Sequence, residues 1–233
     1  MPRDLPILFS APMVLALLRE ARQPGAGKTQ TRRILKPRPV FLASVNDHEA
    51  PTLNARMEID GTWHVYDGDD RAPQSEPLNV RFEKGDRLWV RATLKRRDNT
   101  WQYEADRAVV ALDLPNQKVS AMIAWAHHKE GDTCVSIHMP RWASRLTLTV
   151  TDVRVQRIQD IRHADAKAEG VLPFAPHRAP QGGSCDGDSS GFDDCARCAF
   201  KLLWAQINGP QAWFANPWVV AVTFDVALRN IDA

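Results

Sequence analysis

The chain has 233 residues, of which 44% are hydrophobic and 25% are charged. This composition is ordinary for a folded protein and excludes wholesale disorder, a collagen-like chain and a multi-pass membrane protein. The formal net charge is only +2, from 30 basic and 28 acidic residues, and taken whole it argues against a strongly basic nucleic-acid binder.

The first forty residues predict a strand, a helix and a second strand. Residues 5–9 are short and apolar, as in a strand. Ser10 offers an N-cap oxygen to the helix that follows, and the turn-forming residues 23–25 end that helix. Residues 30–35 predict another short strand, which the following prolines stop.

The middle of the chain predicts an insertion and a pair of strands. Residues 40–83 are rich in acidic residues, glycine and proline, and we interpret them as a surface insertion with a hairpin strand at residues 63–66. After the turn at residues 84–86, apolar and polar residues alternate over residues 87–93, as in a half-buried strand. We expect residues 101–105 to pair with it.

The second half contains the longest strand signal. Over residues 144–158 the apolar positions change parity, which a bulge near Asp152 would reconcile. Residues 160–170 predict a short helix with its first residue as N-cap and its last as stop, and residues 192–208 predict another. Residues 218–228 alternate as in a closing strand. Together the elements predict an α+β fold with a small mixed β-barrel or curled sheet.

The low net charge is a cancellation between segments. Residues 1–46 carry eight basic and two acidic residues, whereas residues 47–83 carry three basic and nine acidic residues. Residues 84–145 are net basic, and residues 146–233 are slightly acidic. The chain without residues 47–83 carries a charge of +8. Such asymmetry points to an anionic ligand or partner.

The sequence favours a cytoplasmic protein without a membrane partner. Residues 5–18 are apolar, but they contain Pro6 and Pro12 and no small-residue cleavage site follows before Arg19, so we reject a signal peptide. The stretch is also too short to span a bilayer. Four cysteines in a chain of this size do not form a disulfide framework.

A glycine-rich loop at residues 25–29 resembles part of a phosphate-binding P-loop. We reject that interpretation because Arg22 stands where the motif needs its first glycine, and because the order helix, loop, strand is reversed. Basic and polar side chains nevertheless crowd the segment that follows: Lys28, Thr31, Arg32, Arg33, Lys36 and Arg38. Two alternatives remain open, a solvated basic edge strand and an anion pocket in which the loop positions Lys28.

A second basic segment precedes the long strand. His138, Arg141, Trp142 and Arg145 mix groups that stack on a base with groups that pair with its phosphate. The alternative is a loop whose tryptophan fills the core and whose arginines are solvated. Glu169 stands at the end of a predicted helix, where the helix dipole disfavours a negative charge. Its carboxylate is therefore either exposed to solvent or placed there for a function.

Three cysteines cluster in the second half of the chain. Cys185, Cys195 and Cys198 have a spacing typical of zinc ligands, and His177 is the candidate for the fourth ligand. A structural zinc ion would crosslink and stabilise the Gly/Asp/Ser-rich loop between them. The alternative is free thiols at the start of a helix.

Residues 27–33 read GKTQTRR and resemble the GxKTxTxR signature of ASCH domains, which are PUA-like β-barrels associated with RNA. Further segments, in the same order, are similar to ASCH-type proteins of tailed phages and prophages: residues 85–91, 136–145, 160–171, 203–209 and 216–219. The resemblance implies a single PUA-like domain over residues 1–233, with insertions at about residues 40–83 and 173–198.

One branch of this superfamily consists of amidohydrolases that deacylate N4-acetylcytidine. By motif position, Lys28, Thr31 and Glu169 match the base, the nucleophile and the acid/base of that branch, and Arg33 would contact the substrate or oxyanion. The resemblance implies no cofactor for this chemistry. Ala92 is a departure, because ASCH relatives often carry an acidic residue at that place.

Three functions follow from these observations. The first is hydrolysis of an acyl amide on a cytosine-type base or nucleoside. The second is non-catalytic binding of RNA or single-stranded DNA in a basic cleft, with RNA favoured, and the third is RNA cleavage. The side chains expected to bind substrate or nucleic acid are Thr29, Arg32, Arg33, His138, Arg141, Trp142 and Arg145. The sequence does not predict an oligomeric state.

Overall fold

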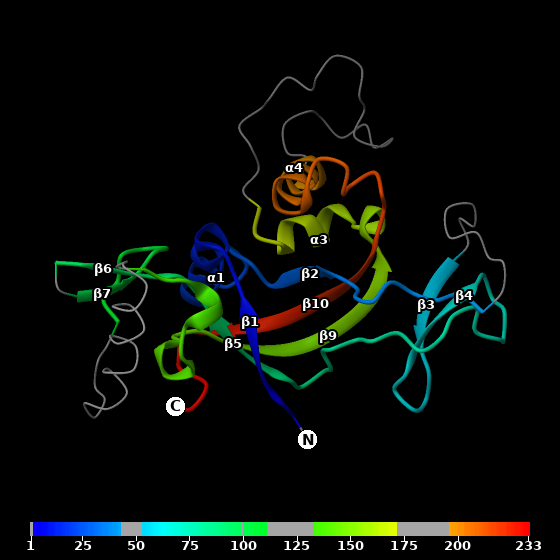
Figure 1. Ribbon diagram of the computed structural model, residues 1–233, viewed down its shortest axis with the longest axis horizontal. Helices are drawn as coiled ribbons and strands as arrows, with labels where there is room; N and C mark the ends of the chain where they lie inside the picture. Colours follow the sequence, from blue (N-terminus) through cyan, green and yellow to red (C-terminus); the bar gives the residue numbers. More distant parts are fainter. Residues whose placement is uncertain (1, 43–52, 99, 111–132, 172–195) are drawn as a thin grey trace, which may run out of the picture. The chain divides into compact units, whose positions relative to one another are not determined.

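The computed structural model describes residues 2–42, 53–98, 100–110, 133–171 and 196–233 (Figure 1). The chain forms two compact units. The first unit comprises residues 1–29, 85–151 and 224–233, and the second comprises residues 30–84 and 152–223. No helix in the described ranges has the length and apolar character needed to cross a membrane.

The main sheet confirms the predicted α+β class. Its five strands are hydrogen-bonded in the order β1 (Asp4–Leu8), β5 (Arg87–Arg91), β9 (Thr147–Arg157), β10 (Trp218–Ala227) and β2 (Gln30–Ile34). This order has two ends, so the strand pairs of the described residues form an open sheet and not a closed barrel. By the bounds of the units, β9 and β10 each contribute residues to both.

The first unit contains a parallel strand pair and one long helix. β1 runs parallel to β5, from Asp4 opposite Arg87 to Leu8 opposite Arg91. The helix α1 (Ala11–Arg22) follows β1 and buries Val14, Leu17 and Leu18, as the apolar stripe predicts.

A small second sheet in the first unit corrects one expected pairing. Its strands are β7 (Thr100–Tyr103), β6 (Leu94–Arg97) and β8 (Thr133–Cys134), in that order. The expectation that residues 101–105 pair with residues 87–93 is wrong, because β7 pairs with β6. The chain reverses after β6, where Asp98 has a positive φ of 49°, and the strand nearest in sequence becomes the partner.

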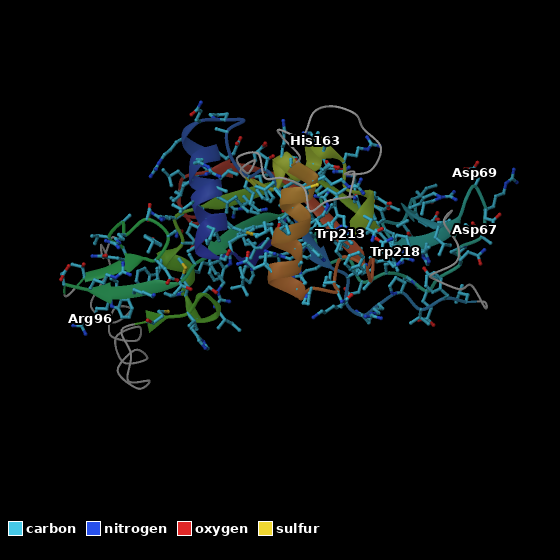
Figure 2. All side chains as sticks on the ribbon, turned by 90° about the horizontal axis from the view of Figure 1, so that it is seen from above. Asp67, Asp69, Arg96, His163, Trp213 and Trp218 are labelled. Carbon is cyan, nitrogen blue, oxygen red and sulfur yellow. The ribbon has the colours of Figure 1, made fainter. Side chains whose placement is uncertain are left out.

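The second unit places two helices on the β2 side of the sheet. β2 pairs antiparallel with β10, from Gln30 opposite Thr223 to Ile34 opposite Val219. The helix α3 (His163–Ala168) lies between β2 and the helix α4 (Ala196–Asn208), as Figure 1 shows. The predicted acidic insertion contains a hairpin of β3 (Leu53–Met57) and β4 (Trp63–Asp67), which carries Asp67 and Asp69 at one end (Figure 2).

An aromatic core joins these helices to β10. Phe200 of α4 lies 5.9 Å from Trp204 and 6.4 Å from Trp213, measured between ring centres, and Figure 2 shows Trp213 beside α4. Val219 of β10 packs into the same cluster. The cluster also contains Ile158, Ile161, Ala166 and Ala196. Consequently residues 218–222 are buried at every position, and not at alternate ones as the sequence pattern predicts.

The first helix of the second unit starts later than predicted. A 3₁₀ turn covers Ile158–Asp160, and α3 begins only at His163 with Arg162 as its N-cap. The Asp160 carboxylate instead accepts a hydrogen bond from the backbone N–H of Arg157. Asp160 therefore belongs to the 3₁₀ turn and is not the N-cap of α3. Gly170, with a φ of 77°, ends the helix as predicted.

The single domain with two insertions stays a prediction.

Candidate functional site

The glycine-rich loop after α1 is closed around a carboxylate of the chain itself. Glu20 of α1 accepts the backbone N–H of Gly25 at 2.9 Å and that of Gly27 at 2.9 Å. Backbone amides of this kind are the groups that hold phosphate in a P-loop. In this protein they are occupied by Glu20, which supports the rejection of a nucleotide triphosphate site at the loop.

Gly27 is required by the close approach of this loop to α1. A Cβ atom at Gly27 would overlap the Ala16 carbonyl oxygen and the backbone of Glu20. The backbone N–H of the next residue, Lys28, donates to the same Ala16 carbonyl at 3.1 Å. Gly27 therefore lets the chain pass against the helix just before Lys28.

We expect Gly27→Ala to lower the free energy of unfolding by about 1–3 kcal/mol, because the added methyl group forces the loop away from α1. Urea denaturation measures the effect. Ala26→Ser is the matched control, since Ala26 is exposed one residue earlier and the substitution should change stability by less than about 0.5 kcal/mol. Equal stability of both variants would contradict this account of the loop.

Lys28 is fully buried in the first unit. Its side chain is 0% exposed, and its ammonium group lies 5.8 Å from the centre of the Phe9 ring. A lysine removed from water in this way is suited to chemistry and not to solvation. Ala92, the departure from the ASCH pattern, is also buried, and its backbone N–H donates to the Met139 sulfur at 3.0 Å. A carboxylate there would have to be buried as well, which agrees with a small apolar residue.

The second unit holds a buried group of charged and polar side chains, which we call the Arg32 network. It consists of Gln30, Arg32, Arg154, Asp165 and Glu169. The Arg32 Nη1 atom donates to Gln30 at 2.7 Å and to Glu169 at 3.0 Å. Asp165 accepts from Arg154 at 3.1 Å and lies 3.5 Å from the Arg32 Nη2 atom. Gln30 also donates to Thr223 at 3.0 Å, which ties the network to β10.

Local structure explains why these groups meet. Gln30 and Arg32 are two residues apart on β2, and so share a face, as their hydrogen bond confirms. Asp165 in the first turn of α3 and Glu169 at its C-cap are four residues apart, so both lie on the side of the helix that meets Arg32. Burial lowers the pKa of the Arg32 guanidinium, and the charge of Glu169 counteracts this effect. For Asp165 burial raises the pKa, but the hydrogen bonds from Arg154 and Gln30 and the charges of Arg154 and Arg32 together outweigh burial, and the net pKa is lowered.

Glu169 interacts with charged groups from both faces of β2. Thr31 and Arg33 lie on the face opposite to Gln30 and Arg32 by the alternation of a strand. Burial lowers the pKa of Arg33, and the charge of Glu169 counteracts this effect. In the strand order of the described residues, β2 is an end strand, so one of its two edges is not paired with another strand of this sheet. Thr31 itself is buried opposite Val222 of β10.

The second basic segment is neutralised by carboxylates within the first unit. Arg141 donates to Asp4 at 2.6 Å and to Asp232 at 2.6 Å, and these hydrogen bonds raise its pKa. Arg145 forms a two-bond pair with Asp106 at 2.7 and 3.0 Å and lies 3.8 Å from the centre of the Tyr103 ring. A phosphate would have to displace these carboxylates to bind either arginine.

The remaining predicted binding residues lie apart from the Arg32 network in the chain. His138 is exposed at the end of a 3₁₀ turn, Ser136–His138, and Trp142 is half-buried in the next one, Arg141–Ala143. Thr29 accepts the Phe224 N–H with its carbonyl oxygen, within the first unit. Their roles in binding stay predictions.

Asp106 provides a test of the first unit's ion pairs. Burial raises the pKa of its carboxyl group, but the hydrogen bonds from Arg145 and Ala108, together with the positive charges of Arg145 and Arg22, outweigh burial, so the net pKa is below the ordinary 3.8. A carboxyl with a depressed folded-state pKa stabilises the fold above its unfolded pKa, and this contribution is lost as the pH falls through the folded value. We expect Asp106→Asn to cost about 2 kcal/mol at pH 7 and progressively less below about pH 4.

Urea denaturation of the wild type and of Asp106→Asn between pH 7 and pH 3 measures how the difference in their free energies of unfolding shrinks as the pH falls. Asp225→Asn is the control, since Asp225 is exposed on β10 in the same unit. A cost for Asp106→Asn that stays constant with pH would contradict the role of the carboxylate.

The predicted zinc ligands fall largely outside the described residues. His177, Cys185 and Cys195 are not among them. Cys198 lies in α4 and is disulfide-bonded, so it would need reduction before its thiolate could bind a metal. In the part of the chain that the structure describes, no group of three or more His, Cys, Asp or Glu side chains is arranged to hold a metal ion. The zinc site stays a prediction.

Sequence reasoning missed the partners of Arg32. It singled out Arg32 and Glu169 but not Gln30, Arg154 or Asp165. The spacing of Asp165 and Glu169 on a predicted helix was the available signal.

Comparison with known protein families, with curated proteins and with solved structures finds no match to this chain.

Proposed function

We propose that the protein is an ASCH-type amidohydrolase, with the PUA-like ancestry that its signature implies, which removes an acyl group from an N4-acylated cytosine or cytidine. The observation that carries the proposal is that Glu169, in the second unit, interacts with two neighbouring arginines of β2. It accepts a hydrogen bond from Arg32 and interacts with the charge of Arg33, which shares the strand face of Thr31. In the proposed site Glu169 acts as the acid/base, and Thr31 is the nucleophile that the resemblance implies.

In the proposed reaction, the Thr31 hydroxyl attacks the acyl carbon and Lys28 accepts its proton. Arg33 stabilises the oxyanion that forms. The C–N bond then breaks, the amine of cytosine leaves with a proton delivered through Glu169, and an acyl ester remains on Thr31. Water hydrolyses this ester and restores the hydroxyl. Lys28 comes three residues before Thr31, so their α-carbons are at most about 11 Å apart.

A small nucleoside suits these residues better than a nucleic-acid strand. Binding of a polyanion needs several cations free to pair with phosphates. Arg141 and Arg145 are each paired with carboxylates, and Arg32 is paired with Glu169. Each of these three arginines is thus paired with a carboxylate within its own unit, which favours a neutral substrate over a phosphate backbone.

Incubation with N4-acetylcytidine and N4-benzoylcytosine, with the products separated by chromatography, tests the proposal. We expect release of cytidine or cytosine, and a loss of about 100-fold or more in rate for Thr31→Val and for Lys28→Ala. Thr149→Val is the matched control, because Thr149 is exposed on β9 and should leave the rate unchanged.

No product, or undiminished activity of Lys28→Ala, would refute the mechanism. Binding to single-stranded RNA that weakens steeply as salt rises, without hydrolysis, would instead support the nucleic-acid-binding alternative. Cleavage of the RNA itself would favour the third function.

A further inference from the structure

Arg32 has two donor atoms, Nε and Nη2, that make no hydrogen bond with the described residues, and Nη2 is held only by an ion pair with Asp165 at 3.5 Å. Its side chain is 0% exposed, and its Nη1 atom is used by Gln30 and Glu169. Its Nε and Nη2 atoms have no hydrogen-bond partner among the described residues. A buried donor left in this state costs about 1–3 kcal/mol, so a pair of them in a native fold calls for an explanation.

These two donors form a fork. In arginine the Nε–H and Nη2–H bonds leave the same edge of the planar guanidinium group and run side by side. A fork of this kind matches two adjacent acceptor atoms in one plane. The opposite, Nη1 side of the group is held by Gln30 and Glu169, and the Phe200 ring lies 5.8 Å from the guanidinium carbon. The orientation of the fork is therefore fixed by its neighbours.

The surrounding charges favour a neutral acceptor over an anion. Asp165 Oδ2 lies 3.5 Å from Nη2 without making a hydrogen bond, and Glu169 lies at Nη1. A carboxylate or phosphate at the fork would be placed close to both of these negative groups and would be repelled. A carbonyl oxygen next to a ring nitrogen offers two acceptors without that repulsion.

We propose that the Nε/Nη2 fork of Arg32 binds the O2 and N3 atoms of a cytosine ring, an assignment that rests on the proposed function. Both atoms are adjacent acceptors, in the way that O6 and N7 of guanine accept a bidentate arginine. Acylation at N4 leaves both in place. In a uracil ring N3 carries a hydrogen and becomes a donor, which opposes the arginine. The fork thus selects the cytosine class and makes no contact with the N4 amide.

Calorimetric titration of the full chain with cytidine, 3-deazacytidine and uridine tests this assignment. 3-Deazacytidine keeps O2 but has a C–H group in place of N3. We expect cytidine to bind at least about 10-fold more tightly than either analogue, which corresponds to about 1.4 kcal/mol. In Arg32→Lys, which keeps the charge but loses the fork, the ratio should fall to near one.

Arg154→Lys is the matched control, because Arg154 also pairs with Asp165 but is partly exposed, and it should keep the ratio. Equal affinity of the wild type for cytidine and 3-deazacytidine overturns the assignment, as does a ratio that Arg32→Lys preserves. If Arg32→Lys does not fold, the wild-type series alone decides. Hydrolysis of N4-acetylcytidine together with equal affinities would leave the proposed function standing and the fork refuted. Absence of both binding and hydrolysis would refute both.

Discussion

Replacement of Phe200 by alanine is expected to lower the free energy of unfolding by about 3–5 kcal/mol. Phe200 is buried in the second unit, where its ring contacts Trp204 and Trp213 and lies beside the Arg32 guanidinium. Its removal leaves a cavity in the aromatic core that the surrounding rings, held by the helix and by β10, can fill only in part. Urea denaturation followed by tryptophan fluorescence measures the loss, since two of the neighbouring rings are tryptophans.

Leu202→Ala is the matched control for Phe200→Ala. Leu202 lies two residues later on the same helix and is 54% exposed, so its truncation should cost less than about 0.5 kcal/mol. The comparison separates the loss of core packing from any change in helix propensity. Similar stabilities of the two variants would show that the aromatic cluster does not hold α4 in place.

The second large effect is expected for Arg32→Met, which should cost about 3–5 kcal/mol. Methionine fills much of the same volume, so the loss comes mainly from the charge. Glu169 is buried, and without Arg32 it loses an ion pair at 3.0 Å. Gln30 loses the donor to its side-chain oxygen at the same time. The variant is compared with the wild type by urea denaturation at pH 7.

A double-mutant cycle distinguishes a charge effect from a packing effect. Glu169→Gln removes the negative charge, so Arg32→Met together with Glu169→Gln should recover part of the stability that Arg32→Met alone loses. If the costs of the two single changes simply add, the pair does not couple and the Arg32 network is not an energetic unit.

The local pattern of the sequence predicted most of the strands and helices. β1, α1, β2, β4, β5 and β10 all lie where periodicity and turn residues placed them. The pattern failed where long-range packing decides. The alternation in β10 predicted one buried face, but Val219 is buried as well because it packs against the aromatic cluster. A strand sequence does not record what covers its second face.

The candidate site was predicted to a similar degree. The sequence singled out polar residues that are buried in the structure, since Lys28, Thr31, Arg32 and Glu169 are all nearly inaccessible to water. It did not predict that Glu20 would occupy the amides of the glycine-rich loop, because that contact depends on the close approach of loop and helix. Nor did it predict the carboxylate partners of Arg141, which lie about 90 and 137 residues away in the chain.

The sharing of β10 between the two units has a consequence for how the chain acquires its structure during synthesis. Its first residues belong to the second unit, and its last residues to the first. Of the described strands, β10 is also the last along the chain. Neither unit can therefore complete its sheet on the ribosome before residues 218–227 have emerged, and each depends on pairings of long sequence separation. Shortened nascent chains that end before β10 should expose the apolar faces of both units and require chaperones.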